Sequence, residues 1–103
     1  MKTLIQRVPF GKGRFEPIRA VRFLEGEQEF EVEFDSGGIG LLPNADLRRA
    51  NGLLPKSTTV DSIWIDGETQ SGFFVRYGDG TTAEASWELV LENPPFRRPV
   101  AGP

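Results

Sequence analysis

The sequence predicts an all-β domain with minor helical turns, and three observations support this prediction. Residues 18–47 and 60–89 form two copies of one unit, offset by 42 positions. Within each copy, apolar and polar residues alternate with the period of two that is typical of half-buried strands. Turn signals rich in glycine separate the alternating stretches. A repeat of about 40 residues is typical of folds assembled from a unit that cannot bury its own apolar face.

The two copies match through their apolar positions and through the short turn that ends each of them. The central alternation returns one register later in the second copy, which has gained one residue in its first hairpin loop and lost one after its second strand. The matched pairs are Val21 with Ile63, Phe23 with Ile65, Phe30 with Phe73, Val32 with Val75, Phe34 with Tyr77, Asn44 with Ser86, Asp46 with Glu88 and Leu47 with Leu89.

The repeat sets the expected domain organisation. With 103 residues the chain is long enough for one domain with its own core. Two copies are too few for a solenoid, so we expect a six- or seven-stranded sandwich or partly open barrel, built from two three-stranded meanders related by a pseudo-twofold axis. The alternative is two small barrels in tandem. The single domain would span 1–92, comprising an N-terminal strand and turn at 1–17, repeat one at 18–52, a linker at 53–59 and repeat two at 60–92, before a flexible Pro-rich tail at 93–103.

Each element follows from local chemistry. Residues 3–10 predict a strand that leads into a turn at Gly11 and Gly13, which lacks the residues of a phosphate loop. Asp79-Gly80 is a hairpin signal because both residues tolerate positive φ. Asn44 and Ser86 are expected to accept hydrogen bonds at helix N-termini. Strands are expected at 18–24, 29–35, 38–43, 60–66, 72–78 and 81–85, and helical turns at 44–50 and 86–89.

Strand alternation divides the first copy into a buried side and an acidic side. The residues expected to share the buried side are Val21, Phe23, Phe30, Val32, Phe34, Ile39 and Leu41. The residues expected outside form an acidic stripe of Glu27, Glu29, Glu31, Glu33 and Asp35. Carboxylates in a row along one strand do not converge on a point, so no metal site is expected. We interpret the stripe as a solvated face that protects a strand edge or matches nearby basic residues.

The second copy carries aromatic residues where the first is charged. Arg22 corresponds to Trp64, Glu31 to Phe74, and Glu33 to Arg76. An exposed apolar patch beside a cation is typical of an interaction site. Alternatively, the N-terminal strand, the linker or a second copy of the chain covers these aromatic residues. Trp87 either extends the patch or plugs the end of the core.

Charge is distributed unevenly along the chain. Residues 1–22 carry a net charge of +5, which leaves −8 for the remainder of a chain whose total is −3. The basic residues of this segment are Lys2, Arg7, Lys12, Arg14, Arg19 and Arg22. They either lie near the acidic strand at 27–35 or steer an anionic partner such as nucleic acid, with Phe10 and Phe15 as stacking groups. A pI of about 4.9 counts against the second interpretation.

Composition excludes several classes of protein. The chain has no cysteine and no histidine, which removes disulfides, thiolate chemistry and the commonest general base. No nucleophile stands beside a recognisable base, so we expect no enzyme, no cofactor and no small-molecule substrate. No apolar run approaches the length of a bilayer span, so no membrane association is expected. The start of the chain lacks the apolar region of a secretory signal, and a cytoplasmic location is expected.

Residues 74–89, running from Phe74-Val75-Arg76-Tyr77 through Trp87-Glu88-Leu89, resemble the end of a Tudor-like or SH3-like small barrel. Val32-Glu33-Phe34 through Asp46-Leu47 follow the same pattern in the first copy. The resemblance implies a module that binds peptides, methylated side chains or nucleic acid.

Taken together, the sequence predicts a non-enzymatic protein-interaction or adaptor module. The candidate partner-binding residues are Trp64, Phe74, Arg76 and Trp87, and the partner is another protein or a second copy of the chain. The alternative is a small nucleic-acid-binding β-barrel protein that uses the six basic residues of the N-terminal segment.

Overall fold

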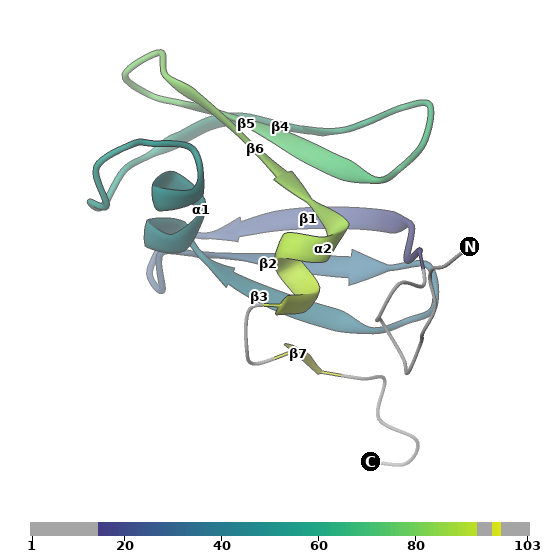
Figure 1. Cartoon of the computed structure of the whole chain (residues 1–103). Coiled ribbons are helices and arrows are strands. Elements are labelled where there is room, and N and C mark those ends of the chain that lie inside the picture. The colour runs from purple at the N-terminus through teal and green to yellow at the C-terminus, as the bar shows by residue number, and fades with distance from the viewer. Residues whose placement is uncertain (1–14, 93–95, 98–103) are drawn as a thin grey trace.

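The computed structural model describes residues 15–92 and 96–97, and it is mostly β-structure (Figure 1). Three strands and a short helix follow one another twice along the chain, and a two-residue strand comes last. The elements are β1 (Ile18–Leu24), β2 (Glu29–Phe34), β3 (Ile39–Pro43), α1 (Asn44–Ala50), β4 (Val60–Ile65), β5 (Gly72–Tyr77), β6 (Thr82–Ser86), α2 (Trp87–Glu92) and β7 (Phe96–Arg97).

The strands form two open antiparallel sheets that face each other (Figure 1). One has the order β1-β2-β3-β7 and the other has the order β4-β5-β6. β1 and β4 contact each other at one side of the pair, whereas α1 and α2 each contact both β3 and β6 at the other side. Neither sheet closes on itself, and the helices rather than strand pairing cover the open side. The partly open barrel, which the sequence offered as an alternative to a sandwich, is not confirmed.

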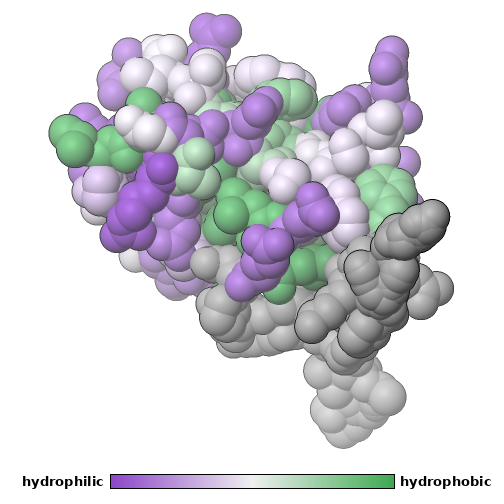
Figure 2. All heavy atoms as spheres, viewed as in Figure 1, coloured by the Kyte–Doolittle hydropathy of each residue, from purple (hydrophilic) through white to green (hydrophobic). Residues whose placement is uncertain are grey.

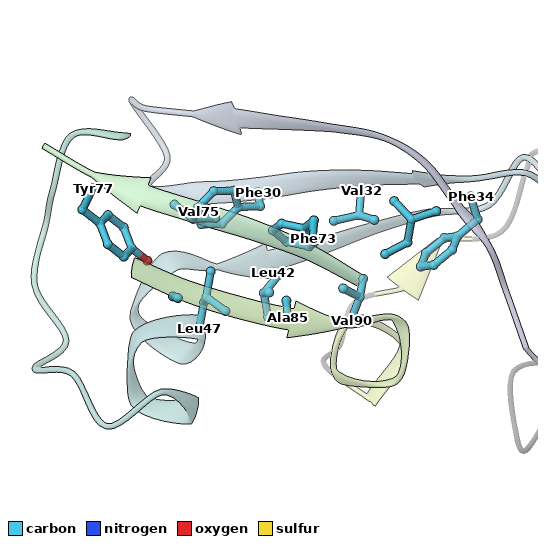
Figure 3. Packing of buried hydrophobic residues seen from close by; sticks show 12 residues of the cluster. Phe30, Val32, Phe34, Leu42, Leu47, Phe73, Val75, Tyr77, Ala85 and Val90 are labelled. Carbon is cyan, nitrogen blue, oxygen red and sulfur yellow. The ribbon is translucent and has the colours of Figure 1, made fainter. Parts of the chain in front are cut away.

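Both sheets contribute to one core. Phe30 of β2 and Phe73 of β5 meet across the interface with ring centroids 5.8 Å apart. Figure 3 shows this cluster, with Tyr77 at one end and Phe34 at the other. The buried apolar residues are Ile18, Phe30, Val32, Phe34, Leu42, Leu47, Phe73, Val75, Tyr77, Ala83, Ala85 and Val90.

The inward face of β3 differs from the prediction. Ile39 and Leu41 were expected inside, but Leu42 is buried and both of the others are only partly covered. Leu42 lies opposite Phe30, and Leu41 lies opposite Glu31 on the outer side. The turn sets this register, and a slip of one residue moves every side chain to the other face. Two adjacent leucines left the alternation ambiguous in the sequence.

The start of α2 agrees with the prediction, whereas the start of α1 does not. Ser86 Oγ accepts a hydrogen bond from the Leu89 N–H at 3.2 Å, as expected of a cap. The N-cap position of α1 is Pro43, which makes no side-chain cap bond, and the Asn44 side chain is buried instead. Asn44 was therefore wrongly predicted as a cap. Val90, rather than Leu89, is the buried residue of α2.

Two glutamines in hairpin turns connect the sheets. Gln28 and Gln70 have left-handed φ values of 54° and 55°. The Gln28 carboxamide donates to the Thr58 carbonyl and accepts from the Thr58 N–H, both at 3.1 Å. Gln70 pairs with Ile18 through its side-chain Nε2 at 3.0 Å and its own carbonyl oxygen at 2.8 Å. The first hairpin of each sheet is thereby fixed to the chain that enters the other sheet.

Part of the Pro-rich tail pairs with the first sheet. Phe96 lies opposite Gly40 and Arg97 opposite Ile39, so β7 extends the sheet beyond β3. The predicted strand at 3–10, the turn after it and the remaining tail positions lie outside the described residues. Within the described residues, no helix has the length and apolar character needed to cross a bilayer.

Candidate interaction surface

Trp64 and Phe74 form a stacked pair on the outer side of the second sheet. They lie opposite each other on β4 and β5, with ring centroids 5.6 Å apart and an interplanar angle of 22°. Alternation turns them away from the core, because Ile63, Ile65 and Phe73 occupy the inward positions. Trp64 remains 45% exposed.

Arg76 lies on the same side of β5 as Phe74, two residues further along. Its neighbours across the strands are Ser62 and Thr82, and its side chain is exposed. It forms no ion pair with any of the described residues. We call the outer residues Trp64, Phe74 and Arg76 the aromatic face.

Trp87 lies away from the aromatic face. It begins α2 and packs against the core cluster, and its ring meets that of Phe15 edge to face at a centroid distance of 5.6 Å. Of the two alternatives that the sequence left open, the structure therefore supports the plug at the end of the core. Tyr77 is 1% exposed and faces inward, so it cannot complete an aromatic cage with Trp64 and Phe74.

An open groove of about 570 Å³ adjoins the aromatic face at Phe74. Its lining residues are Ala50, Asn51, Asp66, Ser71, Gly72, Phe73, Phe74, Glu84, Ala85, Ser86, Glu88, Leu89 and Glu92. Figure 2 shows hydrophobic side chains gathered in the middle of the side on which α2 lies, with hydrophilic ones around them. The groove thus combines apolar walls with an acidic rim.

Hydrogen bonds at the hairpin turn keep the Asp66 carboxylate ionised at this rim. The backbone N–H of Glu68 donates to Asp66 Oδ1 at 2.9 Å, and the Thr69 hydroxyl donates to Oδ2 at 2.9 Å. The bonds from Glu68 and Thr69 stabilise the charged form and lower the pKa of Asp66 below its usual value.

Asn51 blocks the centre of the free edge of β6. Its carboxamide donates to the Glu84 carbonyl at 3.0 Å and accepts from the Glu84 N–H at 3.1 Å, as a neighbouring strand would. The same nitrogen donates to the Leu47 carbonyl at 2.8 Å, which fixes the side chain to α1. A strand from another molecule cannot pair at this position while Asn51 occupies it.

The acidic stripe pairs with basic residues of β1. Arg19 binds Glu33 with an N···O distance of 2.6 Å, and Arg22 binds Glu31. The hydrogen bond to Glu31 raises the pKa of Arg22 above its ordinary value. β2 lies between β1 and β3, so the stripe protects no strand edge, and charge matching accounts for Glu31 and Glu33. Lys2, Arg7, Lys12 and Arg14 lie outside the described residues.

A buried polar cluster near α1 was not predicted from the sequence. Arg48 is 2% exposed, and its Nε donates to the Leu54 carbonyl at 2.6 Å. Its guanidinium lies over the Tyr77 ring, 4.6 Å from the centroid, and Nη1 has no hydrogen-bond partner among the described residues. Asn44 joins the cluster by donating to Thr58 Oγ1 at 2.9 Å. Nothing in the local sequence distinguishes Arg48 from the exposed Arg49 beside it.

The described residues contain no group of three or more acidic side chains that could hold a metal ion. Comparison with known proteins supplies no relative, because no family model, no curated protein and no solved structure matches this chain.

Proposed function

We propose that this chain is a non-enzymatic protein-interaction or adaptor module that binds a protein partner through the aromatic face. The observation that carries the proposal is the pair of Trp64 and Phe74, stacked on the outside of a sheet with Trp64 45% exposed. Tryptophan and arginine are among the residues enriched at the energetic centres of interfaces. The exposed Arg76, unpaired within the described residues, would supply the polar contact beside the apolar one.

The equivalent pair of residues on the first sheet differs in chemistry, and this difference supports the proposal. The position that pairs Trp64 with Phe74 in the second sheet pairs Arg22 with Glu31 in the first, and those two side chains form an ion pair. The charges of an exposed ion pair are already matched by each other and by water, so covering the pair with another protein gains little free energy. At this position the first sheet carries an ion pair on its outer side, whereas the second carries an aromatic pair.

We propose further that the two halves are duplicated units related by a pseudo-twofold axis. The repeated order of three strands and a helix supports this proposal. So do the irregular pairings at equivalent positions, between Ile18 and Ala20 in one sheet and between Val60 and Ser62 in the other. Divergence of the outer side after duplication would explain why only the second unit carries the aromatic face.

Arg19 and Arg22, the described members of the basic set, are held by Glu33 and Glu31. This pairing favours a protein partner over a nucleic acid.

The test compares two double variants. Trp64→Ser with Phe74→Ser removes the aromatic pair, whereas Arg22→Ser with Glu31→Ser removes the matching pair of the other sheet and serves as control. We expect the first variant alone to lose captured partners in quantitative cross-linking pull-downs, or to lose concentration-dependent self-association in sedimentation. Unchanged partners and unchanged solution mass in a folded aromatic variant would overturn the proposal.

A further inference from the structure

The aromatic face and the groove form one continuous surface. Trp64, Phe74 and Glu84 lie side by side across β4, β5 and β6, because Phe74 is opposite Trp64 in one strand pair and opposite Glu84 in the other. Phe74 and Glu84 also line the groove, which continues to Leu89 of α2. A bound segment that covers the indole of Trp64 can therefore reach the groove without crossing another element.

The charges that line the groove have one sign, and Arg76, the cation of the aromatic face, is not among the lining residues. Asp66, Glu84, Glu88 and Glu92 line the groove, and no lysine or arginine is among the lining residues. Glu84, Glu88 and Glu92 are exposed, and their carboxylates form no ion pair within the part of the chain that the structure describes. These carboxylates do not converge to hold a metal ion. They form instead an extended anionic rim along the apolar walls of the groove.

The edge of β6 limits how a partner can bind here. The main-chain N–H and carbonyl of Glu84 are both bonded to Asn51. Strand addition, which depends on free main-chain groups along an edge, is blocked at the centre of β6. Side-chain contacts must then supply the recognition.

This inference rests on the function proposed above. We propose that the partner presents a basic segment, with lysine or arginine residues flanking an apolar anchor. The apolar anchor packs into the groove against Phe74 and Leu89. A flanking cation lies over the face of Trp64, the aromatic ring that attracts cations most strongly. The other basic residues pair with Glu84, Glu88 and Glu92 along the rim.

The test selects random 12-residue peptides displayed on phage against the full chain, with counter-selection on the Trp64→Ser, Phe74→Ser variant. Peptides enriched in lysine or arginine around an apolar residue are expected. A selected peptide, synthesised with a fluorescent label, then reports affinity by anisotropy. Raising the salt concentration should weaken its binding, because the rim contacts are solvent-exposed.

Two triple variants with the same change in charge locate the contacts. Glu84→Gln, Glu88→Gln, Glu92→Gln should bind the peptide about tenfold more weakly, since three exposed ion pairs are lost. Glu25→Gln, Glu27→Gln, Asp35→Asn removes three exposed carboxylates from the turns of the first sheet and should change affinity less than about twofold.

The outcomes separate the two proposals. Enrichment of acidic or uncharged peptides that still require Trp64 and Phe74 would overturn the basic partner and leave the interaction surface in place. Equal weakening by both triple variants would also overturn it, because only the overall field of the protein would then matter. Loss of affinity confined to the groove variant supports it. A selection that enriches no peptide over the aromatic variant would count against both proposals.

Discussion

The hydroxyl of Tyr77 donates a hydrogen bond to Oδ1 of Asn44 at 2.8 Å, and both side chains are buried. This bond connects β5 of the second sheet to the start of α1. The same Asn44 donates to Gln28 and Thr58, so one carboxamide links three separate segments at the end of the core.

Tyr77→Phe should destabilise the fold by about 1–3 kcal/mol, because it leaves Asn44 Oδ1 buried without its donor. Urea denaturation followed by tryptophan fluorescence measures the change. Ser62→Ala, at an exposed position, serves as control and should change stability by less than about 0.5 kcal/mol. Equal stability of Tyr77→Phe and wild type would show that the bond contributes nothing to the folded state.

The pKa of Tyr77 is raised mainly by burial, with the nearby Arg48 opposing the shift. A raised pKa in the folded state means that the folded protein keeps its proton where the unfolded chain has lost it. This contribution to stability is complete below the unfolded pKa of about 10, and it is lost as the pH rises through the folded value. Tyr77 is the only tyrosine in the chain, so tyrosinate absorbance reports its titration directly. A midpoint at or below that of free tyrosine would contradict the prediction.

Asn51→Ala should lower the free energy of unfolding by about 1–2 kcal/mol, because it removes the bonds to Leu47 and to both main-chain groups of Glu84. It should also expose the edge of β6 and promote association between molecules. Urea denaturation and static light scattering measure the two effects separately. Unchanged stability and unchanged scattering would show that the carboxamide neither holds nor protects the strand.

Gly72→Ala should destabilise the fold by about 1–3 kcal/mol through overpacking. A methyl group at Gly72 would stand 2.6 Å from the backbone oxygen of Ala85 on the neighbouring strand, which cannot move without shifting the sheet. Gly67→Ala is the matched control, since nothing lies within 4 Å of its added methyl group. Thermal unfolding of the two variants should differ accordingly, and equal melting temperatures would contradict the prediction.

The sequence predicted the strands well because their signals are local. Val32 and Val75 lie on strands in which every second residue is buried and the residues between are at least partly exposed, and turns such as Asp79-Gly80 mark where those strands end. The outward position of Trp64 follows from the same alternation. A period of two is sufficient wherever only one register satisfies it.

The sequence failed where a residue's role depends on distant partners. Asn44 has the chemistry of a helix cap, but its hydrogen bonds to Tyr77 and Thr58 come from segments that only the fold brings near. Arg48 is buried for the same reason, because its Nε donates to the Leu54 carbonyl and its guanidinium lies over the Tyr77 ring. Leu41 and Leu42 show a third limit, because two adjacent apolar residues give no indication of which one faces inward.

Through Gln28 and Gln70, each half of the chain holds the chain that enters the other half's sheet in place. Because the first hairpin of each sheet holds the chain that enters the opposite sheet, two fragments divided between Gly52 and Leu53 would each lack half of the interior and the partner of one anchoring glutamine. Such fragments should stay unstructured alone and regain the native fold when mixed, as complementing pieces do.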